Sequence, residues 1–344
     1  MKKIIYLFTV LIIPALVFYS CESNPAGPQS DLSNLGSLVK GKSDMTIKLT
    51  EDLVVTETFL IPDGYTLDGK GHTITAMDPP GGHFTGAVVM NEGSVAHVKN
   101  LTVTASNLAN VCDAGGDRLR GIMLEGASGS IEHCTVTGIN QGPSGCQEGN
   151  AIEVRNEPFD GTHPATVKVK IEHNKIYDYQ KTGIVCNGDV DAEVKKNTIG
   201  ASATQENLAA NSVQFGYGAT GSVEDNKIDG NQWMGTSDWA ATAVLIYLAD
   251  GVKVNKNKIK GNSDIGVYFY GNDGKVEKNK IEDEGPDHPN SGYDIGLGDY
   301  GENNKISKNK IKGFDTPLDA LVTGFERLSK TANSTASAGV DPFE

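Results

Sequence analysis

Short segments in which apolar and polar residues alternate recur along most of the chain. The commonest form is a Val or Ile followed by any two residues, an asparagine, any one residue and an Ile. Alternation with a period of two is typical of a β-strand that buries one face. The asparagines of six complete copies, spaced by 22 to 31 residues, are Asn174, Asn197, Asn226, Asn257, Asn279 and Asn309. Two earlier copies carry Leu101 and Cys134 at this position.

A second apolar segment of the same alternating kind lies between these copies. Examples are residues 121–124, 151–154, 183–186, 212–215, 243–246, 266–269 and 294–297. One short strand cannot bury its apolar face alone, but a coil of short strands can do so by stacking on its neighbours. We therefore expect internal stacks of apolar residues and a ladder of asparagines, with neighbouring coils about 4.8 Å apart.

This layout resembles the right-handed parallel β-helix of the pectin lyase-like superfamily. The resemblance covers residues 45–313, and residues 61–74 are similar to the first coils of such proteins. It implies an all-β, single-stranded solenoid of eight or nine coils, with the handedness that parallel crossover connections generally prefer. The resemblance does not define an activity, because unrelated activities occur on this fold.

The N-terminal residues have the layout of a secretion signal, with a basic start, an apolar run and then Cys21. Residues 1–20 resemble a bacterial lipoprotein signal peptide. This resemblance implies that Cys21 is lipidated and that the protein is an outer-membrane lipoprotein of the bacterial cell envelope. The alternative is an uncleaved membrane anchor, for which the apolar run is marginal in length. Residues 21–44 are rich in Ser, Gly, Pro and Asn, which is typical of a flexible tether.

The last part of the chain, residues 314–344, departs from the repeat. We expect it to form a short cap over the exposed edge of the last coil, followed by a disordered tail over residues 331–344. The cap is predicted from four apolar residues with roughly helical spacing, Leu318, Leu321, Val322 and Phe325.

The composition agrees with a turn-rich β protein. The 344 residues include 41 glycines, which weaken helix interiors. An apolar content of 38% can form a core, so disorder of the whole chain is excluded. The formal net charge of −14 makes nucleic acid a poor partner, because phosphate binding needs a basic face. We expect a monomer whose only membrane contact is the N-terminal lipid.

Long insertions after the Asn-Ile segments indicate which side of the solenoid carries function. They are residues 104–120, 137–150, 200–211, 229–242 and 282–293. The resemblance implies that the sheet after these loops forms a sugar cleft, as in the carbohydrate-active relatives. Alternation predicts two outward columns on this sheet. The first is Met123, Glu153, Val185, Gln214, Leu245, Tyr268 and Gly296, and the second is Glu125, Arg155, Asn187, Gly216, Tyr247, Tyr270 and Gly298.

Three of the four arginines lie beside this sheet, where they would bind an acidic polysaccharide. Tyrosines offer flat surfaces for sugar rings. β-Elimination or epimerisation needs a base and a group that stabilises the negative charge formed on the substrate. The predicted catalytic residues are Arg118, Glu153 and Arg155, and the predicted substrate-binding residues are Arg120, Glu125, Asn187, Gln214, Tyr247, Tyr268 and Tyr270. Asp113 and Asp117, with Glu125 or Glu153, are candidate calcium ligands.

Other interpretations remain open at this point. Glu153 and Arg155 also fit a charge ladder across coils, and the tyrosines also fit a solvated sheet. Asp287 and His288 lie in a segment similar to the Asp-Pro-His-Asp motif of alginate epimerases, but the order differs and a plain turn also fits. The open functions are a polysaccharide lyase or epimerase, a non-catalytic glycan-binding surface protein, and a structural adhesin.

Four cysteines follow Cys21. Cys134 and Cys186 occupy ladder or inward positions and are expected to pack as small apolar residues. Cys112 and Cys146 lie in successive long loops on the same side, and an oxidising envelope permits a disulfide between them. Their spacing leaves open whether they pair.

Overall fold

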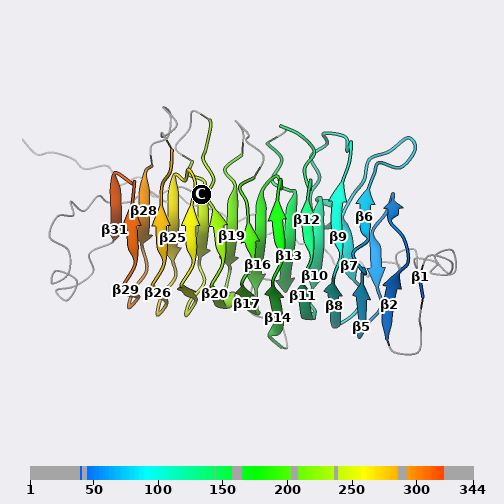
Figure 1. The fold of residues 1–344 in the computed structure, drawn as a ribbon, viewed down its shortest axis with the longest axis horizontal. Helices are drawn as coiled ribbons and strands as arrows, with labels where there is room; N and C mark the ends of the chain where they lie inside the picture. The colour runs from blue at the N-terminus through cyan, green and yellow to red at the C-terminus, as the bar shows by residue number, and fades with distance from the viewer. Residues whose placement is uncertain are drawn as a thin grey trace, which may run out of the picture.

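The computed structural model describes residues 39–40, 45–143, 145–156, 165–202, 208–235, 239–285 and 293–320. These residues form three long sheets, which we call sheets A, B and C, wrapped around one elongated core. Figure 1 shows the coils stacked along the long axis of the molecule, from β2 in blue to β31 in red. Within the described residues, no helix is long and apolar enough to cross a membrane.

Sheet A consists of β1 (Val39–Lys40), β2 (Thr46–Leu49), β5 (Tyr65–Asp68), β8 (Val95–Lys99), β11 (Ser128–Glu132), β14 (Val167–Glu172), β17 (Val190–Lys195), β20 (Thr220–Glu224), β23 (Lys253–Asn255), β26 (Lys275–Glu277) and β29 (Lys305–Ser307). Sheet B consists of β3 (Leu53–Val55), β6 (Thr73–Ala76), β9 (Thr102–Ala105), β12 (Thr135–Thr137), β15 (Lys175–Tyr177), β18 (Thr198–Ile199), β21 (Lys227–Asp229), β24 (Lys258–Lys260), β27 (Lys280–Glu282) and β30 (Lys310–Lys312).

Sheet C consists of β4 (Phe59–Ile61), β7 (Ala87–Asn91), β10 (Arg120–Glu125), β13 (Asn150–Asn156), β16 (Thr182–Gly188), β19 (Asn211–Gly216), β22 (Thr242–Tyr247), β25 (Ile265–Tyr270), β28 (Ile295–Asp299) and β31 (Thr316–Ala320). A short 3-10 turn, η1 (Gly115–Asp117), precedes β10. From β2 to β31 the strands follow the order A, B, C ten times, and successive coils pair in parallel.

The all-β solenoid predicted from the repeat is confirmed, but its extent differs from the prediction. The described residues form ten coils rather than eight or nine, because the first coils lack the asparagine and one strand lies beyond residue 313. In that last strand, β31, Leu318 pairs with Leu297, so Leu318 continues sheet C instead of starting a helical cap. At the other end, β1 pairs antiparallel with β2 inside the segment predicted to be a tether.

The core is a set of apolar columns inside the solenoid. One column on sheet A is Val98, Ile131, Ile171, Val194, Val223, Val254 and Val276, all with 0% of their surface exposed. Complete burial of each such side chain contributes about 1.5–3 kcal/mol, so a column of seven stabilises the stack strongly. The strand alternation found in the sequence therefore corresponds to residues that point inward and outward.

The predicted asparagine ladder is confirmed at the turn between sheets A and B. Asn226 is typical: its Oδ1 accepts from the backbone N–H of Asn197 at 2.8 Å, and its Nδ2 donates to the carbonyl of Val194 at 2.9 Å. Nδ2 also donates to Oδ1 of Asn257 at 3.0 Å. The ladder extends to Cys134, whose backbone N–H donates to Oδ1 of Asn174.

The residue before each ladder position adopts a left-handed conformation. These residues are His133, His173, Lys196, Asp225, Lys256, Lys278 and Lys308, with φ between 54° and 60°. A left-handed non-glycine residue costs roughly 1–2 kcal/mol, and the ladder hydrogen bonds offset this cost. The repeated turn thus sets one outward side chain per coil along a straight line.

The register of sheet C agrees with the predicted columns up to β25. Glu153 pairs with Val185, Gln214 with Leu245 and Leu245 with Tyr268. In β28 the prediction was wrong by two residues, because Tyr268 pairs with Gly298 and not with Gly296. The reason is that Leu297, which is 0% exposed, takes the inward position that Ile295 was expected to fill.

Candidate functional site

A cavity of about 330 Å³ lies on the outer face of sheet C, around β19 and β22. Its lining residues lie in or next to β16, β19 and β22 and in the long insertions. They are Gln147, Lys181, Ala209, Asn211, Gln214, Tyr217, Trp233, Trp239, Leu245 and Tyr247. We call this cavity the sheet C pocket. It contains two of the predicted substrate-binding residues, Gln214 and Tyr247.

Aromatic side chains make up much of the wall of the sheet C pocket. Tyr217 is 44% exposed and meets Tyr247 edge to face, with ring centroids 5.9 Å apart. Tyr270, 37% exposed, continues this row beyond the pocket, 5.6 Å from Tyr247. Trp239 is 38% exposed. Exposed, flat, amphipathic rings of this kind can stack on the faces of sugar rings.

A buried carboxylate holds the loop that carries both tryptophans. Asp264, which is 1% exposed, accepts hydrogen bonds from the backbone N–H groups of Trp233 at 2.7 Å and Ala241 at 2.8 Å. Asn231 closes the base of the same loop, because its Nδ2 donates to the carbonyl of Thr242 at 2.9 Å. The described parts of this loop are therefore fixed against the solenoid by non-local contacts.

Lys181 is the cation of the sheet C pocket. Its Nζ donates to the carbonyl of Ala209 at 2.6 Å, and none of the described carboxylates lies within ion-pair distance of it. Burial of the ammonium disfavours the charged form and lowers the pKa of Lys181 to about 8. A desolvated amine of this kind can bind an anionic group when protonated and accept a proton when neutral.

Amide side chains line the floor beside Lys181. Nδ2 of Asn211 donates to Oε1 of Gln214 at 3.3 Å, and the Thr242 hydroxyl donates to Oδ1 of Asn211 at 2.9 Å. Nε2 of Gln214 donates to Oδ1 of Asn187 at 3.4 Å, which connects the pocket to the next predicted substrate-binding residue. These groups offer both donors and acceptors, as sugar hydroxyls require.

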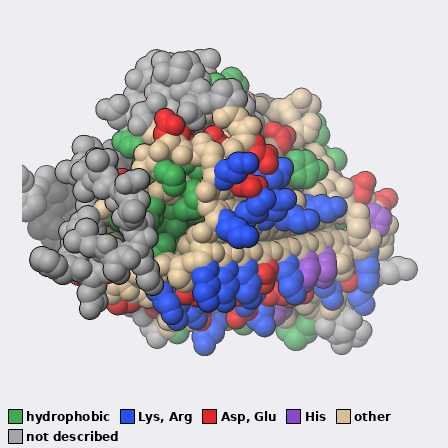
Figure 2. Space-filling model, turned by 60° about the vertical axis from the view of Figure 1, so that its left-hand side comes forward, with side chains coloured by type: hydrophobic (Ala, Val, Ile, Leu, Met, Phe, Trp, Pro, Cys, Tyr) green, Lys and Arg blue, Asp and Glu red, His purple; other side chains and the backbone are tan. Residues whose placement is uncertain are grey.

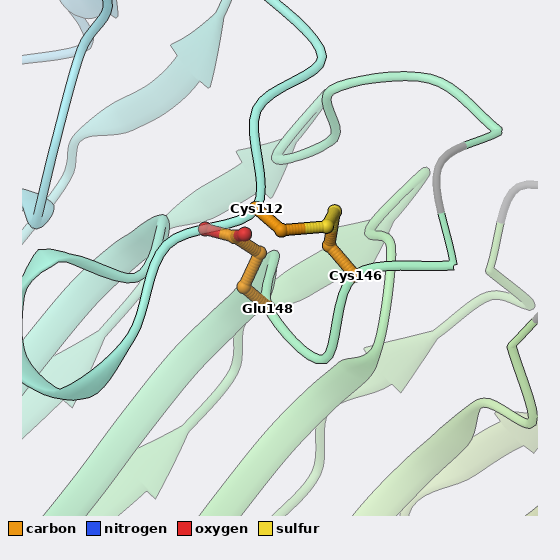
Figure 3. A group of neighbouring side chains, drawn as sticks. All are labelled: Cys112, Cys146 and Glu148. Carbon is orange, nitrogen blue, oxygen red and sulfur yellow. A yellow bond between two sulfur atoms is a disulfide. The ribbon is translucent and has the colours of Figure 1, made fainter.

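A disulfide joins two of the long loops next to the pocket. Cys112 and Cys146 are bonded, with their Cα atoms 5.2 Å apart, so the pairing that the sequence left open is formed. Figure 3 shows Glu148 beside this bridge. Its carboxylate accepts from the backbone N–H groups of Asp113 at 2.9 Å and Leu119 at 2.7 Å. Gln147, between the two fixed residues Cys146 and Glu148, is thereby held in the pocket wall.

The same three side chains are the one group of potential metal ligands found within the described residues. Both cysteine sulfurs are in the disulfide and offer no thiolate, and Glu148 already accepts backbone hydrogen bonds. The donor set therefore does not suit a metal ion.

The arginines and carboxylates do converge, but they mainly bind one another. Nε of Arg120 donates to Glu153 at 2.8 Å, and its other nitrogens donate to the carbonyls of Gly115, Gly116 and Arg118. Arg120 is 2% exposed and Glu153 is 4% exposed. We therefore correct the predicted contact of these two side chains with substrate: in this structure they hold the loop before β10.

Arg155 pairs with Glu125 in the neighbouring strand and lies 3.9 Å from Glu153. This arrangement corresponds to the charge ladder that the sequence left open, because Glu125 and Arg155 are register partners in β10 and β13. Arg118 lies at the end of η1, and its buried Nε has no hydrogen-bond partner among the described residues. The catalytic roles predicted for Arg118 and Arg155 stay predictions.

Two of the candidate calcium ligands bind other side chains. Asp113 binds Nε2 of His83 at 3.0 Å, Asp117 is exposed in η1, and Glu125 binds Arg155. Calcium binding stays a prediction. Asp287, His288 and Cys21 lie outside the described residues.

Tyr268 differs from the other two predicted tyrosines. It is 4% exposed and packs with Leu245, Ile265 and Ile295 in a second apolar cluster, separate from the main core. The centroid of its ring lies 4.8 Å from that of Tyr300. Its predicted role as a sugar-binding surface is therefore corrected to packing under the loops. Strand alternation identifies the outward direction, but it cannot show that another segment covers the side chain.

Lys181, Trp233 and Trp239 were missed from the sequence. One signal was available for the tryptophans, because both tryptophans of the chain lie in the insertion 229–242. No comparable signal marks Lys181 among the many lysines of the repeat.

Comparisons with known proteins agree with this architecture. The family model described as "right handed beta helix region" matches residues 161–317. This segment is therefore similar to that family, and the described residues have a parallel β-helix fold. No curated protein matches it.

Three solved structures illustrate the likeness. A mutant DFA-IIIase from Arthrobacter chlorophenolicus A6 in complex with DFA-III is 13% identical, with a TM-score of 0.51 over 89% of this chain and 85% of that chain. The Dettilon tailspike protein is 14% identical, with a TM-score of 0.47 over 76% of this chain, which spans 55% of the tailspike chain. The Azotobacter vinelandii mannuronan C-5 epimerase AlgE4 A-module is 13% identical, with a TM-score of 0.31 over 81% of this chain and 90% of that chain.

Proposed function

We propose that this protein binds an acidic carbohydrate in the sheet C pocket. The observation that carries the proposal is the combination of exposed aromatic rings with an ammonium, that of Lys181, which has no partner among the described carboxylates. The rings of Tyr217, Tyr247 and Trp239 supply stacking surfaces, and Asn211 and Gln214 supply polar contacts. A protonated Lys181 selects a sugar with a carboxylate or another anionic substituent.

The test measures binding of short oligouronates to the full chain by calorimetry, with neutral oligosaccharides of the same length for comparison. Lys181→Met is expected to weaken oligouronate binding by about tenfold or more. Lys168→Met, at an exposed position on sheet A, is the matched control and should leave binding unchanged. Equal affinity for acidic and neutral oligosaccharides, or unchanged binding by Lys181→Met, would refute the role of Lys181.

A second candidate function, a polysaccharide lyase or epimerase, is favoured by the lowered pKa of Lys181. Near pH 8 a substantial fraction of the amine is neutral and can take the proton from the carbon next to the sugar carboxylate. The electron pair left on carbon then either expels the glycosidic oxygen, which leaves an unsaturated sugar, or accepts a proton on the opposite face. In this proposal Lys181, and not one of the predicted catalytic residues Arg118, Glu153 and Arg155, is the base.

Turnover is tested with alginate and polygalacturonate by following the absorbance of unsaturated sugars and the uronate stereochemistry by NMR. If the wild type turns over neither polymer, the lyase or epimerase proposal fails for these substrates and only the binding proposal remains. The same assays with added calcium and with a chelator test the proposed calcium role, and a stimulated rate that is lost in Asp113→Asn would support it.

We also propose that lipidated Cys21 attaches the chain to the outer membrane as a monomer. Mass spectrometry of the mature protein should show an acylated Cys21, and Cys21→Ser should move the protein from the membrane fraction to the soluble fraction. A Cys21→Ser variant that stays in the membrane would indicate an uncleaved helix instead.

A further inference from the structure

Eleven lysines gather in three coils at the C-terminal end of the solenoid, although the chain as a whole has a net charge of −14. They lie in residues 253–260, 275–282 and 305–312, where Glu277 and Glu282 are the only carboxylates. We call this surface the lysine grid.

Nine of these lysines form three parallel rows. The first row is Lys253, Lys275 and Lys305 on sheet A, the second is Lys256, Lys278 and Lys308 at the left-handed turn positions, and the third is Lys258, Lys280 and Lys310 on sheet B. All nine are exposed. Neighbours within a row belong to adjacent coils and are therefore about 4.8 Å apart along the solenoid.

Figure 2 shows a face of the molecule on which the side chains of Lys and Arg, in blue, form rows, one of which continues into histidine side chains in purple. The left-handed turn positions have the same order. The coils before Lys256 carry His133, His173, Lys196 and Asp225 at this position. The rings of His133 and His173 stack with centroids 5.0 Å apart. The row of outward turn residues thus extends along the axis beyond the grid, with Lys196 as its further cation.

The fold does not require lysine at these positions. In earlier coils the sheet B row carries threonine at Thr102, Thr135 and Thr198 and lysine at Lys175 and Lys227, with the same backbone pairing. Like charges placed directly opposite each other on neighbouring strands are unfavourable, so stacking alone does not explain the lysines.

The two carboxylates within the grid leave it strongly cationic. Glu282 binds Lys280 at 2.7 Å, and Glu277 lies 3.7 Å from Lys305. A hydrogen bond from the Ser307 hydroxyl and, to a smaller extent, the charges of the nearby lysines lower the pKa of Glu277. Within the described residues, Lys258 and Lys310 have no ion-pair partner.

We propose that the lysine grid binds an extended anionic polysaccharide that lies along the solenoid axis. The rows are straight and regularly spaced, as contact with a linear polyanion requires. They also lie on two different sheets and on the corner between them, so a flat membrane surface would reach fewer rows than a polymer chain does. This surface is separate from the sheet C pocket, and the proposal does not depend on the function proposed for that pocket.

The test measures binding of the full chain to immobilised alginate at several salt concentrations, with neutral dextran as the comparison polymer. The variant is Lys258→Thr with Lys310→Thr, because threonine already occupies this row at Thr198. The matched control is Lys168→Thr with Lys170→Thr, which makes the same change in charge at exposed positions of sheet A. Thermal unfolding verifies that both variants fold.

The grid variant is expected to bind alginate about tenfold or more weakly at low salt. The slope of log affinity against log salt should become shallower by about two, roughly one for each lysine removed, since each contact releases counterions. The control variant should retain wild-type affinity. Trp239→Ala, in the sheet C pocket, should leave this salt slope unchanged, which separates the two sites.

Three results would overturn the proposal. The first is equal loss of affinity in the grid and control variants, which would reflect net charge alone. The second is unchanged binding of the grid variant. The third is grid-dependent binding to vesicles that contain phosphatidylglycerol together with grid-independent binding to alginate, which would assign the surface to a membrane.

Discussion

Asp264 accepts a hydrogen bond from the backbone N–H of Trp233 at 2.7 Å, and this contact fixes the aromatic wall of the sheet C pocket. The same Oδ2 atom accepts from Ala241 at 2.8 Å, so one carboxylate holds two points of the loop that carries Trp233 and Trp239. Asp264 lies just before β25, in the coil that follows the loop. The pocket therefore depends on stacking between coils as well as on its own lining residues.

Replacement of this carboxylate should loosen the tryptophan loop. Asp264→Ala leaves two buried N–H groups without an acceptor and is expected to destabilise the fold by about 2–4 kcal/mol. Thermal unfolding and tryptophan emission measure the effect. Asp250→Ala is the control, because Asp250 also accepts a backbone hydrogen bond, from Asn272, but at an exposed site. Unchanged tryptophan emission in Asp264→Ala would contradict this role.

The exposed ring of Trp239 should contribute directly to carbohydrate affinity. Trp239→Ala is expected to weaken binding of a short oligouronate about tenfold without changing the unfolding temperature, because the ring is partly exposed. Tyr177→Ala removes a ring that is 47% exposed on sheet B and should have no effect on binding. Titration calorimetry distinguishes the two variants, and similar losses in both would argue against a specific pocket.

The charge of Lys181 should make pocket binding depend on pH. The pKa of Lys181 is lowered to about 8, so the ammonium is present below pH 8 and is lost as the pH rises through this value. Affinity for an acidic oligosaccharide should therefore fall between about pH 7 and 9. Lys181→Arg keeps its charge over this range, and its affinity should be flat with pH. A wild-type profile without this fall would contradict the assignment of Lys181 as the cation.

The lowered pKa of Lys181 also predicts how the free energy of unfolding changes with pH. The unfolded lysine, with its ordinary pKa of 10.5, binds more protons than the folded one between about pH 8 and 10.5. The contribution of Lys181 to the free energy of unfolding therefore becomes more favourable as the pH rises through this window. The difference in stability between wild type and Lys181→Met, measured across the window, tests this sign.

Position along the asparagine ladder should determine the cost of its loss. Asn226 bonds to coils on both sides, whereas Asn309 ends the ladder and donates to the carbonyl of Val276 at 2.7 Å. Asn226→Ala is expected to cost about 2–4 kcal/mol, and Asn309→Ala about half as much. Chemical denaturation compares them. Equal costs would mean that the ladder bonds act locally and do not join the coils cooperatively.

The disulfide should stabilise the loops that hold Gln147. It closes a segment with a sequence separation of 34, so its loss is expected to cost about 3–4 kcal/mol. Unfolding with and without a reductant measures this cost.

Thiol labelling provides an independent control. Burial raises the pKa of Cys134 to about 12 and also raises the pKa of Cys186, so neither thiol should react in the folded protein. After reduction, label should appear on Cys112 and Cys146. Label on Cys112 before reduction would contradict the bridge.

Much of the fold was predictable because its information is local. A period of two identifies inward residues such as Ile171 and Val223, and the recurring asparagine identifies the turn between sheets A and B. The number of coils was less predictable. The first coils replace the asparagine with other residues, and Leu318 lies in a strand despite its helical spacing relative to later residues.

The candidate site was predicted less well than the fold. Gln214 and Tyr247 were found because alternation shows which side chains leave the sheet. Arg120 and Tyr268 were misjudged because loops cover the outer face of sheet C and bury them. Lys181 carries no distinguishing pattern, since its importance comes from burial and from its distance to carboxylates.

The sequence by itself determined the stacked architecture, the asparagine ladder and the rows of the lysine grid, because each is set by residues that recur at one position of successive coils. The tertiary structure alone decided that Lys181, Trp239 and Tyr247 share one pocket. These residues come from different coils, and their meeting depends on loop conformations that Asp264 and the disulfide between Cys112 and Cys146 fix through long-range contacts. Such contacts leave no periodic trace in the chain, because each occurs once and joins segments that are distant in the sequence.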